Sequence, residues 1–182
     1  MRVIAGTAKG RRLAAPETRD TRPVTDRVKE AVFSSIGGWV VDADVADLYA
    51  GAGSFGLEAL SRGARSAVFV ENGARALTAL KKNIGAVGLG GEVSPVKVRQ
   101  FLEANRKTFH LVFVDPPWPL STEDLEADFA LLDRFLEDEA EVVASRRHTD
   151  RVPVPPENWR VATEKRYGDT RIVRYEKKAE AQ

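Results

Sequence analysis

The stretch DLYAGAGSFG, Asp47–Gly56, joins an apolar segment to a helical one through closely spaced glycines. Residues 45–49, which overlap its start, have the composition of a buried strand, and residues 54–64 have the spacing of a helix. Gly51, Gly53 and Gly56 occupy a G-x-G-x-x-G spacing, which is typical of a strand-to-helix turn that binds a nucleotide. We therefore expect an α/β fold whose ligand lies at this turn.

The alternation of strands and helices continues on the C-terminal side of this stretch. The expected elements are a strand at 66–71, a helix at 74–88, a weak strand at 92–98 and a strong strand at 109–115. An acidic helix follows, with Leu125, Phe129, Leu132 and Leu136 on its apolar face. The last elements are a strand at 140–145 and a hairpin at 159–178 that turns at Gly168-Asp169. This order predicts a mostly parallel sheet with helices on both faces and right-handed crossovers. Functional residues are then expected at the carboxyl ends of the strands.

The N-terminal part differs from the rest in pattern and charge. Residues 2–5 and 11–14 predict two short strands around a Gly/Lys turn, and an irregular linker follows at 15–24. Thr25 is then expected to cap a helix whose apolar positions are Val28, Ala31, Val32, Ile36 and Trp39. We expect two units: a basic β-hairpin with its linker at 1–24, and the main domain at 25–182.

Composition narrows the class of protein. The chain has 182 residues, no cysteine and two histidines, so disulfides are excluded and a metal site is not expected. No apolar run approaches the roughly 20 residues needed to span a bilayer, and the N-terminus lacks a signal-peptide pattern. We expect a monomeric cytoplasmic protein. Basic residues gather in the first thirty positions and after residue 159, which predicts an anion-facing side.

Two acids mark the expected ligand. Glu71 ends the strand after the glycine turn, twenty residues past Gly51, where a carboxylate can accept both ribose hydroxyls. Asp47 precedes the glycines, where it would repel a pyrophosphate but attract an ammonium or sulfonium group. This pair favours S-adenosylmethionine over a dinucleotide as the cofactor.

A second strand end carries the sequence VFVDPPWPL, residues 112–120. Each proline fixes its own φ and restricts the residue before it, so Asp115-Pro116-Pro117-Trp118 is expected to be a stiff shelf. Asp115 and the carbonyl group of Pro116 can accept the N–H groups of an exocyclic amine, and Trp118 offers a face for a flipped-out base. The shelf is typical of an amino-group methyltransferase.

Several segments along the chain resemble motifs of a known family. The segments DLYAGAGSFGLEALSRGA, VFVE and VFVDPPW resemble motifs of Rossmann-type amino-methyltransferases, and RVIAGTAKGRRL, TRPVTDRVKEAVFSSI and YGDTRIVRYE are similar to those of the bacterial 16S rRNA guanine-N2 methyltransferase family that modifies guanine-966. The resemblance implies a Rossmann-like class I methyltransferase fold. Its seven-stranded sheet would be mostly parallel, with a C-terminal antiparallel hairpin strand and a small N-terminal β-hairpin extension. It also implies the substrate, which is 16S rRNA, the small ribosomal subunit or an assembly intermediate.

The resemblance assigns roles to individual residues. The catalytic loop would be Asp115, Pro116, Pro117 and Trp118, and the cofactor would be held by Asp47, Ala50, Gly51, Gly53, Glu71, Asn72, Val98 and Phe101. RNA would be held by Arg2, Lys9, Arg11, Arg12, Arg22, Thr25, Arg27 and Arg171. The chain departs from the family in Trp118, where Phe or Tyr is usual, and in Lys97, where an acid or amide near the adenine is common. Adenine recognition is therefore expected from backbone groups near Val98 and from packing by Phe101.

Three alternatives stay open. The first is an amino-methyltransferase with the same catalytic loop that acts on DNA, on a small molecule, or on another RNA at adenine N6. A non-catalytic RNA-binding assembly factor would keep the fold and the basic surface but not cofactor binding. A dehydrogenase is disfavoured by Asp47 and by the lack of an acid/base residue near the expected cofactor.

Overall fold

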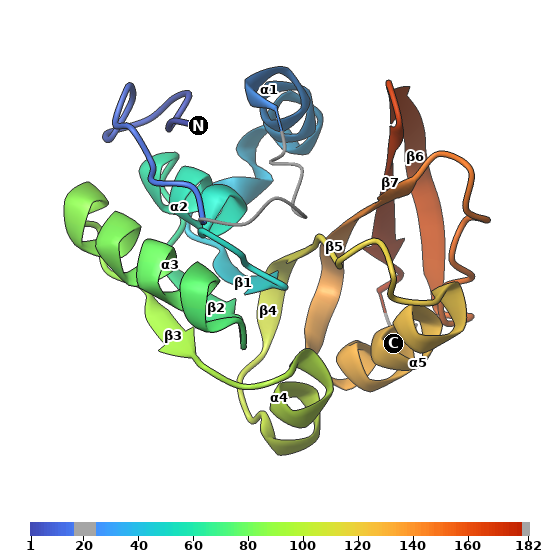
Figure 1. Cartoon of the computed structure of the whole chain (residues 1–182). Coiled ribbons are helices and arrows are strands. Elements are labelled where there is room, and N and C mark those ends of the chain that lie inside the picture. The colour runs from blue at the N-terminus through green and yellow to red at the C-terminus, as the bar shows by residue number, and fades with distance from the viewer. Residues whose placement is uncertain (17–24, 180–182) are drawn as a thin grey trace.

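The protein, analysed as a computed structural model, is built around one seven-stranded sheet in the order β3-β2-β1-β4-β5-β7-β6 (Figure 1). The structure describes residues 1–16 and 25–179. Its parallel part consists of β1 (Asp44–Leu48), β2 (Ser66–Val70), β3 (Glu92–Ser94), β4 (Phe109–Val114) and β5 (Leu136–Arg147). The last two strands, β6 (Trp159–Tyr167) and β7 (Thr170–Lys177), are antiparallel, and β7 lies between β5 and β6. The predicted fold class is confirmed.

Helices cover both faces of the sheet (Figure 1). One face carries α1 (Asp26–Ile36), α2 (Ser54–Ser61) and α3 (Ala74–Val87), which share a core with Val45, Phe69 and Phe113. The other face carries α4 (Val98–Ala104) and α5 (Thr122–Leu132), packed over Val112, Val142 and Tyr175. Because the central strands are buried on both faces, they are nearly continuous apolar runs rather than alternating ones.

Two expected elements end earlier than the sequence pattern indicated. Thr25 caps α1 through its side chain, as predicted, but α1 ends at Ile36, and a 3₁₀ turn at Gly37–Val40 leaves Trp39 half exposed. The acidic helix α5 ends at Leu132, a second 3₁₀ turn covers Asp133–Phe135, and Leu136 begins β5. Leu136 is nevertheless buried, so its apolar character reflects the core rather than the helix face.

One helix was missed. Residues 92–98 were expected to form a weak strand, but β3 stops at Ser94, and Val98 is already the first residue of α4. Lys97 stands at the N-cap with an extended backbone and makes no side-chain cap. Val98 and Leu102, four residues apart, are both buried, so the helical spacing was present but spanned only two turns.

The N-terminal segment packs on α2 instead of standing apart from the core. It forms a turn closed by a single antiparallel bridge between Arg2 and Arg12, rather than two full strands. Val3, Ala8 and Leu13 are buried in the core shared with α1, α2 and α3. The N-terminal segment therefore contributes to the core on this face of the sheet. The boundary predicted at residue 24 lies outside the described residues and stays a prediction.

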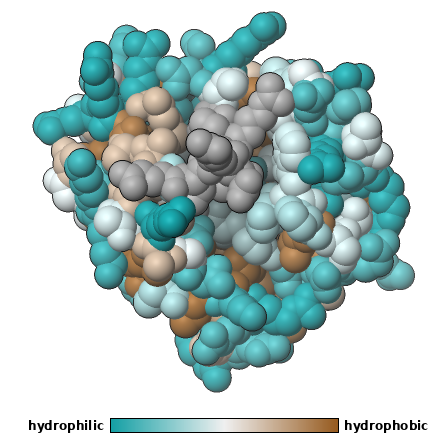
Figure 2. All heavy atoms as spheres, in the orientation of Figure 1, coloured by the Kyte–Doolittle hydropathy of each residue, from teal (hydrophilic) through white to brown (hydrophobic). Residues whose placement is uncertain are grey.

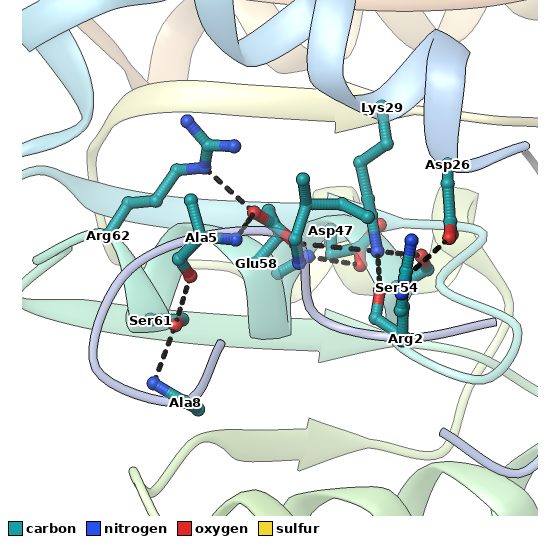
Figure 3. Close-up of polar contacts among 12 residues, drawn as sticks. Arg2, Ala5, Ala8, Asp26, Lys29, Asp47, Ser54, Glu58, Ser61 and Arg62 are labelled. Carbon is teal, nitrogen blue, oxygen red and sulfur yellow. Dashed lines mark hydrogen bonds and ion pairs between the residues drawn. The ribbon is translucent and has the colours of Figure 1, made fainter. Parts of the chain in front are cut away.

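A buried ion pair joins this segment to the rest of the fold (Figure 3). Lys29 on α1 and Glu58 on α2 lie 3.4 Å apart with both side chains fully buried. Glu58 also accepts the backbone N–H groups of Ile4 and Ala5 at 2.7 and 3.0 Å, and the Nε–H of Arg62 at 2.8 Å. Burial lowers the pKa of Lys29, and the carboxylate of Glu58 opposes this change.

Close approach to α2 also explains the glycine in the N-terminal turn. Gly6 has φ +82°, and a Cβ there would lie 1.7 Å from the carbonyl oxygen of Ser61. The hydroxyl of Ser61 in turn accepts the N–H of Ala8 and donates to the carbonyl of Ala5 (Figure 3). Only glycine fits at this position, which fixes the turn against the helix.

Candidate active site

The candidate site lies at the carboxyl edge of the parallel strands. A pocket of about 410 Å³ opens there, a volume that suits a cofactor-sized ligand. Its lining comes from the segments after all four strands β1–β4 and from α5: Tyr49, Val70, Glu71, Asn72, Val96, Lys97, Val98, Arg99, Pro117, Leu120, Asp124 and Asp128. The pocket therefore brings together Glu71, Asn72, Val98 and Pro117 from the predicted site.

The other predicted cofactor residues lie near the pocket but are not part of its lining. Ala50, Gly51 and Gly53 form the turn between β1 and α2, and Phe101, on α4, is partly buried against the core of this face. Asp47 is 1 % exposed, and its Oδ2 accepts the N–H of Gly56 at 2.8 Å in the first turn of α2. Burial raises the pKa of Asp47, and the nearby carboxylates of Asp115 and Glu71 raise it further. Its contact with the cofactor stays a prediction.

Only one glycine of the G-x-G-x-x-G spacing has open space around it. A Cβ at Gly53 would lie 2.5 Å from Leu80, and one at Gly56 would lie 2.3 Å from the ring of Phe69. Gly51 has φ +56°, and no atom lies within 4 Å of its would-be Cβ. Helix-to-sheet packing thus requires Gly53 and Gly56, while Gly51 is the position where a ligand can approach the backbone.

Glu71 is fixed by the backbone around it. Its Oε2 accepts the N–H of Gly51 at 2.8 Å, and its Oε1 accepts the N–H groups of Asn72 and Gly73 at 2.9 and 2.6 Å. These bonds tie the glycine turn to the end of β2 and hold the carboxylate at the pocket wall. A carboxylate offers about four lone-pair sites, so acceptor capacity is left for a ribose hydroxyl. The donor set therefore fits the ribose of a nucleoside cofactor.

The lining of the pocket contains a polar network that the sequence analysis did not predict. The hydroxyl of Tyr49 donates to Oδ2 of Asp128 at 2.5 Å, and Arg99 donates to Oδ1 through Nε and Nη2 at 3.1 and 3.0 Å. Burial, together with this hydrogen bond, raises the pKa of Tyr49. Tyr49 also has φ +59°, a strained conformation for a bulky residue that here keeps its ring on the pocket side. Asp128 and Arg99 are far apart in sequence and fall on helices α5 and α4, so no short motif pointed to them.

The catalytic loop predicted from DPPW leaves the sheet directly beside β1. The backbone N–H of Asp115 donates to the carbonyl of Leu48, and the loop turns back at Leu120, whose N–H donates to the carbonyl of Pro117 at 2.9 Å. Asp115 is half-buried, Pro116 is buried and Trp118 is 38 % exposed. Burial raises the pKa of Asp115, and a hydrogen bond from the hydroxyl of Ser145 partly opposes this rise.

The predicted RNA-binding residues fall into three groups. Lys9, Arg12 and Arg27 are exposed and form no ion pair or side-chain hydrogen bond with a described residue. Arg2 pairs with Asp26 at 2.9 Å and Arg11 donates to the carbonyl of Ala86, though both stay exposed. Thr25 caps α1, and Arg171 is held by Glu164 and by the carbonyl groups of His148 and Asp150. Arg22 lies outside the described residues.

The face of the molecule seen in Figure 2 is largely hydrophilic, with apolar residues in small separate patches. No helix in the described part of the chain combines the length and apolar character of a membrane span. Among residues 1–16 and 25–179, no three histidine or acidic side chains gather in a way that could hold a metal ion.

The sheet order defines the class of protein, which is a Rossmann-like methyltransferase fold. A nucleoside-sized pocket and the DPPW loop lie together at the carboxyl edge of its parallel strands. In keeping with it, the structure matches that of a putative methyltransferase, yhhF, from Escherichia coli with a TM-score of 0.88, 33 % identity and 99 % coverage of both chains.

The chain belongs to the family described as conserved hypothetical protein 95, whose model matches residues 1–176. Among its relatives, the ribosomal RNA small subunit methyltransferase D of Escherichia coli K12 is 34 % identical over all of this chain and 92 % of its own length. The putative rRNA methyltransferase YlbH of Bacillus subtilis is also 34 % identical, over 98 % of this chain and all of its own.

Proposed function

We propose that this protein transfers a methyl group from S-adenosylmethionine to the exocyclic N2 amine of a guanine in small-subunit rRNA, guanine-966 by its family resemblance. The observation that carries the proposal is the placement of the Asp115–Trp118 loop at the same sheet edge as the Glu71-lined pocket. The names of the full-length relatives support rRNA as the substrate class.

The cofactor side of the proposal rests on the pocket. When bound, S-adenosylmethionine supplies an electrophilic methyl group on a sulfonium. Glu71 would accept ribose hydroxyls, since its carboxylate is already oriented by the backbone N–H groups of Gly51, Asn72 and Gly73. The wall made by Val98, Pro117 and Leu120 would enclose the adenine. Tyr49, Arg99 and Asp128 would keep that wall rigid, because their hydrogen bonds join the glycine turn to both helices of this face.

The substrate side rests on the loop. Asp115 would accept one N–H of the guanine amine and the carbonyl of Pro116 the other, which directs the nitrogen lone pair toward the methyl group. The amine would take the methyl group as its bond to the sulfonium breaks, and the Asp115 carboxylate would accept the proton that the amine loses. Trp118 would stack on the extruded base, since its ring is partly exposed.

RNA would be docked by the exposed basic residues of the N-terminal turn and of α1. Lys9 and Arg12 are free to contact phosphate, and Arg27 lies on the first turn of α1. RNA enzymes of this kind act on bases that can be splayed out of loops. Naked 16S rRNA, the small subunit and an assembly intermediate are all substrates to be compared.

The test is a transfer assay with radiolabelled S-adenosylmethionine on 16S rRNA, small subunits, DNA and an adenine-only RNA, followed by mapping of the modified nucleotide. Label on guanine N2 of the rRNA supports the proposal. Label on adenine or DNA replaces it with the alternative amino-methyltransferase activity. If a calorimetric titration detects no cofactor binding while RNA still binds, the protein is a non-catalytic assembly factor instead.

A further inference from the structure

Three consecutive residues at the end of β5 contact the catalytic loop at three different points. The hydroxyl of Ser145 donates to Oδ1 of Asp115, at the start of the loop. The Nη2 of Arg146 donates to the carbonyl of Leu120 at 2.9 Å, at its end. The guanidinium of Arg147 lies over the ring of Trp118, 4.2 Å from the centroid. The loop between β4 and α5 is therefore held along its whole length by one neighbouring strand.

The sheet register explains why this strand reaches the loop. Val114, the last residue of β4, pairs with Ala144 on β5, so Ser145 is level with Asp115. Side chains alternate along a strand, which places Ser145 and Arg147 on one face and Arg146 on the other. On its other edge β5 is paired with β7, where Ser145 is opposite Ile172. Ser145 and Arg146 are 6 % and 4 % exposed, so both positions are fixed by packing.

The hydrogen bond from Ser145 makes the two oxygens of Asp115 different. Oδ1 is occupied by the hydroxyl, whereas Oδ2 accepts no hydrogen bond from a side chain or backbone group of the described residues. A hydroxyl beside one oxygen also restricts rotation of the carboxylate about its χ2 axis, which is otherwise broad. The free oxygen is then held in one direction.

We propose that Ser145 is a positioning residue for methyl transfer, which holds the Asp115 carboxylate so that Oδ2 receives the N–H of the substrate amine. This inference rests on the proposed function, because it gives Asp115 its role there. Arg146 and Arg147 fix the remainder of the same loop. Ser145 itself does not touch the substrate; it acts through Asp115.

The charged groups around the loop also predict a pH dependence of methyl transfer. Among the described residues they are Asp47 on β1, whose pKa the carboxylate of Asp115 raises, and Arg146 and Arg147 on β5. Burial raises the pKa of Asp115, and the Ser145 hydroxyl lowers it by stabilising the ionised form. Removing this hydroxyl would raise the pKa of Asp115 further, so a larger share of the enzyme would be protonated and unable to accept the amine N–H at acidic pH.

The experiment compares Ser145→Ala, Ser145→Thr and the control Thr149→Ala, an exposed position just beyond β5. Single-turnover transfer to rRNA is measured across pH with saturating S-adenosylmethionine. Ser145→Ala should slow transfer about tenfold, the effect of one lost hydrogen bond to a charged group. Its acid limb should move to higher pH while cofactor affinity stays unchanged. Ser145→Thr should restore both rate and pH profile, since it keeps the hydroxyl.

A second measurement does not depend on activity. The carboxyl ¹³C shift of Asp115, followed by NMR during a pH titration of the whole protein, should report a higher pKa in Ser145→Ala than in the wild type. An unchanged pKa, or a wild-type rate and pH profile in Ser145→Ala while Asp115→Ala is inactive, would overturn the positioning role and leave the proposed function standing. A wild-type protein that transfers no methyl group to rRNA would overturn the proposed function itself.

Discussion

Glu58 and Glu71 each accept backbone N–H groups from another segment of the chain, but they do so in opposite settings. Glu58, between the N-terminal turn and α2, is fully buried and lies beside two cations, Lys29 and Arg62. Glu71, at the end of β2, is half-buried, lines the pocket and pairs with no cation among the described residues. The number of hydrogen bonds does not distinguish a structural carboxylate from a ligand-binding one. Glu71 differs from Glu58 in its missing countercharge and its open side, and both fit the ligand-binding role proposed for it.

The largest expected effect concerns Glu58, the structural carboxylate of the two. Glu58→Ala leaves the buried ammonium of Lys29 without its countercharge and the N–H groups of Ile4 and Ala5 without their acceptor. Breaking a buried pair in this way costs about 3–5 kcal/mol of stability. Urea unfolding followed by circular dichroism measures the loss. Glu30→Ala, an exposed position on α1, is the control and should change stability by less than about 0.5 kcal/mol. Equal losses in both variants would contradict the structural role.

The second expected effect tests whether the carboxylate of Asp115 takes part in methyl transfer. Asp115→Ala should lower turnover about a hundredfold or more, because the carboxylate stabilises positive charge that develops on the amine only in the transition state. Affinity for S-adenosylmethionine, measured by calorimetry, should change little. Trp118→Phe should keep much of the activity, because a ring is still available for stacking. Near-normal transfer by Asp115→Ala would remove the loop from the mechanism.

A third, smaller effect concerns Glu71 itself. Glu71→Ala should weaken S-adenosylmethionine binding at least about tenfold, since hydrogen bonds to a charged group contribute roughly 1.5–3 kcal/mol each. Because Glu71 also binds three backbone N–H groups, its loss should reduce stability, but less than Glu58→Ala does. Calorimetry and urea unfolding on the same variant separate the two contributions. If stability falls by several kcal/mol and cofactor affinity does not change, Glu71 belongs with Glu58 as a structural residue.

The smallest effect concerns the outer surface of the N-terminal turn, whose inner side is bound to Glu58. Deleting residues 1–14 would expose that buried ion pair, so the charges are better tested alone. The double variant Lys9→Gln, Arg12→Gln should weaken RNA binding several-fold and lower the salt slope by about 1.4–1.8. Lys107→Gln, an exposed lysine paired with Glu92, is the control. A slope equal to that of the wild type would make Lys9 and Arg12 ordinary solvated charges.

The sequence predicted the parallel sheet, the glycine turn and the DPPW loop because each depends on local pattern. Long strands such as β4 and a capped helix such as α1 are specified by residues close in sequence. The contacts that complete the site were not predictable in this way. Ser145 is thirty residues from Asp115, and Asp128 is seventy-nine from Tyr49, so only the folded sheet brings them together. For a related reason the sequence did not reveal that Arg171 is held by carbonyl groups, and its contact with RNA stays a prediction.

The position of β7 between β5 and β6 gives the chain an order of assembly during its own synthesis. Every residue that lines the pocket, from Tyr49 to Asp128, leaves the ribosome before β5 is complete. Strand β5, which carries Ser145, gains its second neighbour only when Thr170–Lys177 has emerged. Domains generally fold as units, and synthesis adds about 5–20 residues per second. The residues of the pocket are therefore synthesised several seconds before Thr170–Lys177, but the strand that holds the catalytic loop is locked in place only when that last segment pairs with it.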